Sequence, residues 1–269
     1  MLNIAVNIAI AAILSAVIVG ISSPVYTVSR TLMTGFSISH AVMAGGLIGI
    51  YLKYVLNAPI PPEMISIAFV MVLAIFTAEL TERGYDPDTA GAISLAISTL
   101  FLVLFTYLSG PYAFRAWSIV VGTSVIVTPR DIITLAIAAL ITIFIIAIFH
   151  DELLHVAFDP EGCKALGYNV RFYRYVEYAV LALVVTTLTY TLGIIVSHIL
   201  VAAPGVVSLS LTRRRYFYTA TIIAMATTLG GYGLSYFMNT PSSVGVGILA
   251  TFFIVFGEVL KIYKNKAKS

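Results

Sequence analysis

The sequence predicts an all-helical integral membrane protein, a polytopic bundle of eight or nine transmembrane helices that spans residues 1–269 as a single domain. Of the 269 residues, 60% are apolar and 10% are charged, whereas soluble domains are about 45–50% apolar and about 25% charged. Several apolar stretches also reach the roughly 20 residues that a helix needs to cross a hydrocarbon core of about 30 Å. These stretches account for most of the chain and leave no room for a sizeable soluble domain.

Charged residues, prolines and glycines divide the apolar sequence into candidate spans. The first span lacks the positive residues that precede the apolar core of a signal peptide, so we interpret it as a membrane helix. Pro204 and Gly205 can break a helix, and the segment around them therefore decides between eight spans and nine. In chain order, the expected spans are 3–22, 31–52, 63–81, 88–109, 131–150, 174–193, 194–211, 216–237 and 242–261.

Lys and Arg are distributed unevenly between the loops on the two sides of a nine-span bundle. Positive residues near span ends resist translocation and collect on the cytoplasmic side. Only Lys53, Arg115 and Arg130 fall in one set of alternate loops. The other set is therefore expected in the cytoplasm, which predicts a cytoplasmic-membrane protein with its C-terminus inside and its N-terminus outside. That set comprises Arg30, Arg83, Lys164, Arg171, Arg174, Arg213, Arg214, Arg215, Lys261, Lys264, Lys266 and Lys268.

Several function classes are disfavoured by the composition and by missing motifs. The net charge of +3 does not indicate nucleic-acid binding, because the positive residues lie in short loops and in the tail. The sequence contains neither a phosphate-binding loop nor a dinucleotide fingerprint, and it lacks the helix of zinc proteases and the nucleophile elbow of hydrolases. The single cysteine, Cys163, excludes an intramolecular disulfide. Active transport by this chain would therefore need an energy source outside it.

His40 is the first candidate for a functional side chain. It lies ten residues after Arg30, about 15 Å along a helix, and therefore near the middle of the membrane. An ionisable side chain at this depth is costly unless it faces protein or water. Imidazole nitrogen is a common ligand of zinc, manganese and iron. His40 is thus either a metal-contacting residue of a pathway or a neutral histidine hydrogen-bonded to a neighbouring helix.

Four further residues are candidate partners of His40. Ser37 and Ser39 are small polar neighbours on the same span, and Thr34 precedes them. His198 is expected close to the outer membrane surface, where an isolated histidine is tolerated without any role in transport.

Other ionisable residues near span ends have simpler interpretations. Glu258 can pair with Lys261 one turn later on the same helix, although a role in transport is the alternative. His150 and His155 flank two acidic residues at a span end. Their spacing does not match a tetrahedral metal site, so a solvated junction is the preferred interpretation.

Small residues predict close contacts between helices. Ala41, Gly45 and Gly49 recur every fourth residue on one face of the second span, a pattern typical of close backbone packing. Gly230 and Gly231 predict a tightly packed or flexible end of the penultimate span, which is followed by a turn.

The longest charged loop, 151–173, is expected to contain a short helix. Asp159 precedes Pro160 at the first helical position, and Glu161 adds negative charge where the helix dipole favours it. Gly167 fits the end of this helix. The residues alone allow either a docking segment for a soluble partner or an inert connection.

Three groups of residues resemble the zinc/manganese/iron-type permeases of ATP-binding-cassette importers. Residues 158–167 resemble the cytoplasmic coupling segment of that family, whose usual pattern is Asp-x-Glu-x-Ala-x-x-x-Gly. Ser39-His40-Ala41-Val42, followed by Gly45, resembles its second-span signature. The C-terminal half is similar at Gly193-Ile194-Ile195-Val196, Pro204, Gly233-Leu234-Ser235, Pro241 and Phe256.

The resemblance implies a transport subunit rather than an enzyme. Its partners would be a second permease copy, a cytoplasmic ATPase that binds and hydrolyses the ATP, and an extracytoplasmic metal-binding protein. The cargo would be a divalent zinc, manganese or iron ion, with no cofactor bound by this chain itself. His40 matches the family's pathway histidine, with Ser37, Ser39 and His198 as candidate partners. The implied ATPase-coupling residues are Asp159, Glu161, Ala165 and Gly167.

Two positions depart from the family pattern. Phe36 stands where the family commonly has an aspartate, four residues before His40 and on the same helix face. His40 alone does not form a metal site, so either other spans contribute ligands or the cargo differs. Cys163 replaces the usual alanine of the coupling segment, a small-for-small exchange compatible with docking.

Three rival functions follow from these departures and from the polar content. A permease for a metal chelate or vitamin-like cofactor would have a wide apolar path. A secondary transporter or channel would work without an ATPase, and a membrane scaffold would transport nothing.

Overall fold

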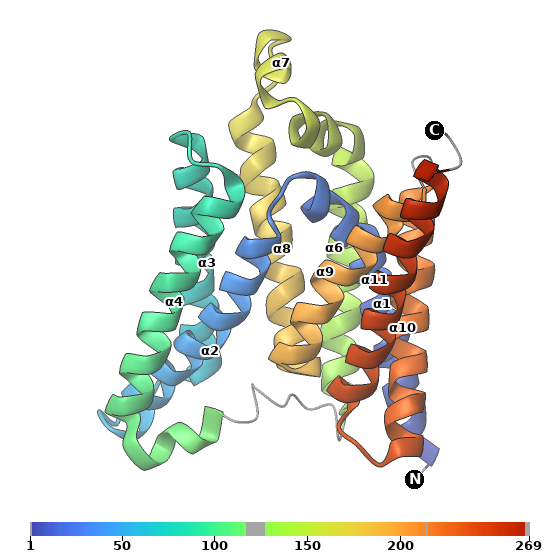
Figure 1. Cartoon of the computed structure of the whole chain (residues 1–269). Helices are drawn as coiled ribbons and strands as arrows, with labels where there is room; N and C mark the ends of the chain where they lie inside the picture. The colour runs from blue at the N-terminus through green and yellow to red at the C-terminus, as the bar shows by residue number, and fades with distance from the viewer. Residues whose placement is uncertain (1, 117–126, 213–214, 267–269) are drawn as a thin grey trace.

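The computed structural model describes residues 2–116, 127–212 and 215–266, which form helices and connecting turns without a strand (Figure 1). The expectation of an all-helical protein is therefore confirmed. The helices are α1 (Leu2–Val28), α2 (Leu32–Tyr54), α3 (Pro62–Glu82), α4 (Pro87–Ser109), the 3-10 helix η1 (Gly110–Ala116), α6 (Pro129–Phe158), α7 (Pro160–Ala165), α8 (Val170–Leu192), α9 (Ile194–Leu211), α10 (Tyr216–Met238) and α11 (Ser242–Lys266).

The choice between eight and nine spans depends on α10 rather than on α9. Within the described residues, eight helices are long and apolar enough to cross a membrane, and α9 is one of them because it continues unbroken through Pro204. The ninth long helix, α10, has 23 residues, the same length as α2 and α8. Its threonines, tyrosines and glycines make it less apolar, but it packs alongside α1, α9 and α11 as a full member of the bundle (Figure 1).

The helices form two groups that α8 connects. Helix α2 packs mainly against α3 and α4, whereas α1 packs against α6, α9 and α10 (Figure 1). Helix α8 contacts α2 and α3 on one side and α6 and α9 on the other. Large apolar side chains of α8, Leu181 and Leu188 among them, are fully buried in this contact. A change in the tilt of α8 would consequently affect both groups.

Glycines allow α2 and α3 to approach closely, as the small-residue pattern predicts. A Cβ atom added to Gly45 would lie 2.6 Å from Cα of Ser66, and one added to Gly49 would lie 2.5 Å from Cα of Pro62. Real Cβ atoms do not come so near to backbone. Any side chain at these glycines would therefore force the two helices apart.

The two ends of the bundle separate the loops as the charge count predicts. The α1–α2 turn with Arg30, the α3–α4 turn with Arg83, helix α7 and the C-terminal end of α11 lie at one end (Figure 1). The N-terminal end of α1 and the start of α6 lie at the opposite end. Arg213, Arg214 and Lys268 of the positive set lie outside the described residues.

The predicted loop 151–173 is mostly helical. Helix α6 bends at Phe149, whose backbone angles are φ −109° and ψ 18°, and then continues to Phe158. Only Asp159 and residues 166–169 link α6, α7 and α8 without helical structure. The expected start of the connection at residue 151 is thus corrected, because residues 151–158 extend the preceding helix beyond the apolar span.

Candidate functional site

The rings of His40 on α2 and His198 on α9 lie against each other. Their centroids are 5.4 Å apart and the ring planes differ by 19°, so the two imidazoles stack. The α8–α9 turn ends well short of the lower ends of α1 and α10 (Figure 1). This short turn places His198, the fifth residue of α9, among the helices. The expectation that His198 is an isolated histidine was therefore wrong, whereas its choice as a candidate partner of His40 agrees with this contact.

Hydrogen bonding leaves nitrogens of both imidazoles available. Nδ1 of His40 lies 3.0 Å from the carbonyl oxygen of Phe36. Since a carbonyl oxygen only accepts, this Nδ1 carries the proton and Nε2 keeps its lone pair. Metal-binding histidines commonly donate their second ring nitrogen in this way. Nε2 of His198 is buried and has no hydrogen-bond partner, which is a costly arrangement unless a ligand completes it.

Phe36 occupies the position of the family's aspartate and packs onto the histidine pair. Its ring lies edge-on to His198, with centroids 5.0 Å apart and planes at 77°. The Phe36 side chain supplies no metal ligand. It packs against the His198 ring, so the two imidazoles lie beside an apolar group.

The hydroxyl residues predicted as partners divide between the histidines and other helices. Thr189 on α8 donates a long hydrogen bond of 3.5 Å to Ser39 Oγ, which in turn donates to the Gly35 carbonyl. Thr34 is buried against Gly91 of α4. Ser37, one turn before His40, has a buried hydroxyl with no partner. Among the predicted partners, the hydroxyls of Ser37 and Thr34 are thus the two without a hydrogen-bond partner.

The histidine pair does not form a complete metal cage. Within residues 2–116, 127–212 and 215–266, no cluster of three or more His, Cys, Asp or Glu side chains is placed to hold an ion. Closed structural zinc sites have four protein ligands and retain their ion. A site with two nitrogens binds more weakly, as transient occupancy requires.

Helix α7 projects from one end of the bundle with its predicted capping residues in place (Figure 1). Asp159 Oδ1 accepts a hydrogen bond of 2.8 Å from the backbone N–H of Gly162, and Pro160 is the first helical residue. Gly167 ends the segment with φ +87°, a conformation that favours glycine. Each structural feature predicted for this short helix is confirmed.

The surface of α7 combines a buried anchor with exposed apolar groups. Cys163 packs between Val156 and Val170, which fixes the helix to α6 and α8. Phe158 and Leu166, at its two ends, are 69% and 79% exposed. Glu161 pairs with Lys164 at 3.1 Å on the outer face, where Ala165 is also exposed. Such a mixed apolar and charged projection is typical of a protein-docking surface.

The predicted pairing of Glu258 with Lys261 is confirmed. Glu258 pairs with Lys261 at 3.4 Å and accepts a hydrogen bond from Ser210. Nδ1 of His150 lies 2.8 Å from Asp151 at an exposed position and belongs to no metal cluster among the described residues.

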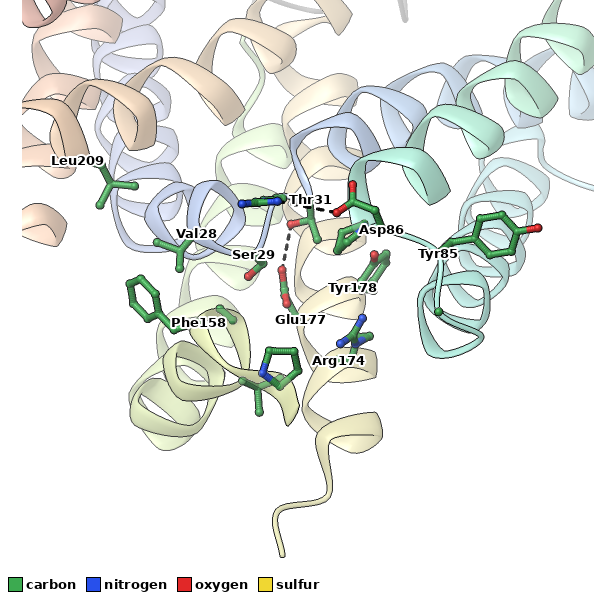
Figure 2. Close-up of a pocket in the computed structure, with 16 residues that line it drawn as sticks. Val28, Ser29, Thr31, Tyr85, Asp86, Phe158, Arg174, Glu177, Tyr178 and Leu209 are labelled. Atoms are coloured by element: carbon green, nitrogen blue, oxygen red, sulfur yellow. Dashed lines mark hydrogen bonds and ion pairs between the residues drawn. The ribbon is translucent and has the colours of Figure 1, made fainter. Parts of the chain in front are cut away.

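The sequence analysis missed Glu177, a buried carboxylate on α8. Its side chain is only 5% exposed and lines a cavity of about 770 Å³ at the end of the bundle that carries α7 (Figure 2). A signal was present, because Glu177 is an acidic residue inside an expected span, and such residues commonly have functions.

Within the described residues, eight helices long and apolar enough to cross a membrane define a polytopic integral membrane protein. The chain belongs to the ABC 3 transport family, because residues 1–261 match the model of that family. This match confirms the resemblance to permeases of ATP-binding-cassette importers.

Known proteins are similar to this chain over most of its length. The manganese transport system membrane protein MntB of Synechocystis sp. is 28% identical over 226 residues, which cover 83% of this chain and 72% of the relative. The manganese transport system membrane protein MntC of Listeria innocua is 27% identical over 257 residues, 91% of this chain and 88% of the relative. The solved structure of PsaBC from Streptococcus pneumoniae in complex with a Fab has a TM-score of 0.76 at 23% identity, covering 93% of this chain and 89% of that chain.

Proposed function

We propose that this chain is the permease subunit of an ATP-driven importer that moves a divalent transition-metal ion across the cytoplasmic membrane. The observation that carries this proposal is the contact between His40 and His198, which directs two imidazoles from different helices to one place in the bundle. Membership of the ABC 3 transport family and the manganese transport relatives support it. Manganese is therefore the first ion to test, with zinc and iron beside it.

The histidine pair would act as a transient station for the ion. Nε2 of His40 is oriented by the bond from Nδ1 to the Phe36 carbonyl, and Nε2 of His198 is buried without a partner. Water, the Ser37 hydroxyl or a group from the delivering protein would complete the coordination. Because only two side chains hold the ion, it can leave again quickly.

The energy would come from a cytoplasmic ATPase that docks on α7. The exposed residues Phe158, Glu161, Ala165 and Leu166 supply the docking surface, and the caps at Asp159 and Gly167 keep the helix rigid. Since α7 joins α6 directly to α8, a push on it reaches both helix groups. Two permease copies would share two ATPases, with an extracytoplasmic metal-binding protein at the opposite end and the C-terminus in the cytoplasm.

Metal uptake into proteoliposomes tests this function. The vesicles hold the chain with its ATPase and its metal-binding protein, and uptake of manganese, zinc and iron is followed with and without ATP. We expect ATP-dependent uptake of one ion, lost in His40→Ala and His198→Ala. His150→Ala is the matched control, because that histidine is half-exposed and pairs with Asp151. Uptake that an ion gradient drives without the ATPase would contradict the proposal.

A metal chelate is the second candidate cargo, and one cavity favours it. A cavity of about 830 Å³ lies between α3, α6 and α8 and is lined mostly by apolar side chains such as Met64, Ile67 and Leu183. Its size suits a small organic ligand. Chelate transport would leave uptake unchanged in His40→Ala, whereas transport of a free ion through the histidine pair would not.

A further inference from the structure

Five parts of the chain line the cavity beside Glu177. They are the α1–α2 turn, the α3–α4 turn, the α6–α7 junction, α8 and, through Leu209, α9 (Figure 2). The turn between α1 and α2 is tight, with Arg30 at φ +58° and the Thr31 N–H bonded to the Tyr26 carbonyl at 2.9 Å. This turn directs Thr31 toward Glu177, and Thr31 Oγ1 donates a hydrogen bond of 2.9 Å to Glu177 Oε1.

The two arginines that line the cavity pair with carboxylates other than Glu177. Arg174 is engaged by Glu82 at 2.9 Å, and Arg30 lies 4.0 Å from Asp86. Within the described residues, no Lys, Arg or His nitrogen comes within 4 Å of the Glu177 carboxylate. A buried carboxylate without a cationic partner is expensive, and a bound cation offsets that cost.

The groups nearest to Glu177 carry oxygen atoms that can act as metal ligands. The Ser29 hydroxyl donates to the Val25 carbonyl at 2.9 Å, and its oxygen lone pairs remain open. The Thr31 oxygen likewise keeps its lone pairs. Carboxylate, hydroxyl and carbonyl oxygens suit hard divalent cations such as Mn²⁺.

We propose that Glu177, Thr31 and Ser29 form a second divalent-cation site, at the end of the bundle that carries α7. The inference rests on the proposed function, because it makes this cavity the last station before the ion leaves the permease. Thr31 precedes α2, and His40 lies nine residues further, about 14 Å along the helix. The ion therefore exchanges imidazole nitrogens for carboxylate and hydroxyl oxygens as it passes along α2.

Counting bound Mn²⁺ tests this site independently of transport. The permease–ATPase complex in lipid nanodiscs is titrated with Mn²⁺, and free Mn²⁺ is measured by electron paramagnetic resonance. We expect two ions per wild-type permease chain and one in Glu177→Gln, which keeps the size of the side chain and can still accept the Thr31 hydrogen bond. Thr31→Val should lower the affinity for the second Mn²⁺ ion about tenfold, whereas Thr31→Ser should leave that affinity unchanged.

Two further variants separate this inference from the proposed function. Glu258→Gln removes the same charge from a half-exposed position on α11 and should leave both ions bound. The double variant His40→Ala/His198→Ala should lose one ion and keep the one at Glu177. If Glu177→Gln binds as many ions as the wild type with equal affinity, the second site is overturned while the histidine site stands. If His40→Ala/His198→Ala loses an ion and Glu177→Gln does not, the second site is likewise overturned and the histidine site stands.

Discussion

The contact between His40 and His198 and the cavity at Glu177 differ in every property that affects cation binding. The first offers two nitrogens beside the apolar ring of Phe36, and the second offers a carboxylate and hydroxyls beside two paired arginines. Both depend on α2, since Thr31 precedes that helix and His40 lies on it. One helix would thus connect the proposed borderline nitrogen site to the proposed hard oxygen site, and neither would have enough ligands to retain an ion.

This difference also concerns how each region connects to the rest of the molecule. His198 is on α9, far from α7, whereas Glu177 lies seven residues into α8, the helix that follows α7. A movement of α7 therefore reaches Glu177 before it reaches the histidines. In the proposed function, the nitrogen site would receive the ion and the oxygen site would release it when α7 moves.

The largest effect is expected when the histidine pair is removed. His40→Ala and His198→Ala should each lower ATP-dependent manganese uptake about a hundredfold, because each removes one of two nitrogens. The double variant should lose no more than either single variant, since both histidines bind the same ion. Initial uptake rates of the four proteins measure this coupling. Strictly additive losses would show that the histidines act separately.

Gly167 offers a way to impair coupling while both cation sites remain intact. Gly167→Val places a β-branched side chain at φ +87° and should cost about 1–2 kcal/mol, which destabilises the end of α7. We expect ATP-dependent uptake to fall about tenfold, with Mn²⁺ binding unchanged. Titration and uptake on the same preparation separate the two effects.

The control for this change is Gly233→Ala. Gly233 is helical on α10, and an added Cβ there meets no atom within 4 Å. Equal losses in Gly167→Val and Gly233→Ala would indicate general damage to the bundle and would contradict a specific role of α7.

Phe36→Asp would make the histidine site more like the Glu177 site. The new carboxylate would lie one turn from His40 on the same face of α2. We expect Mn²⁺ affinity at the histidines to rise about tenfold, with less gain for zinc, because an oxygen ligand favours the harder ion. Phe36→Leu removes the ring without adding a ligand and is the reference. If both variants bind Mn²⁺ alike, a carboxylate at this position contributes nothing.

Most of the fold could be predicted from the sequence because it follows from helix length and apolarity. The capped helix at Asp159 and the contacts at Gly45 and Gly49 depend only on local residues, and they were predicted correctly. The span expected from apolarity ended at residue 150, which was too early for α6. The helix continues through charged residues to Phe158. Pro204 and Gly205 directed attention to α9 as the uncertain span, although among the described helices α9 meets the length and apolarity of a membrane span and α10 is the long helix that does not.

The site could be predicted only in part, because it depends on which helix faces meet. The depth of His40 follows from counting residues along one helix. Its contact with His198 depends on the short α8–α9 turn and on the packing of α9 beside α2, which periodicity along either segment does not specify. Glu177 was visible as a carboxylate in an apolar span, but its burial under the Thr31 turn required the three-dimensional arrangement.

The smallest effect is expected at Glu258. This residue has the same side chain as Glu177 but is half-exposed, so comparing Glu258→Gln with Glu177→Gln tests the effect of burial. Glu258 and Lys261 are each about half-exposed, and such a pair contributes less than about 1 kcal/mol. Glu258→Gln should therefore leave uptake within about twofold of wild type and shift the unfolding temperature by no more than a few degrees. Thermal unfolding in detergent and uptake in proteoliposomes check both expectations. If Glu258→Gln instead matched Glu177→Gln in lost Mn²⁺ binding, the total negative charge at this end of the bundle would control occupancy. If only Glu177→Gln loses an ion, the same carboxylate binds Mn²⁺ because it is buried and lacks a cationic partner.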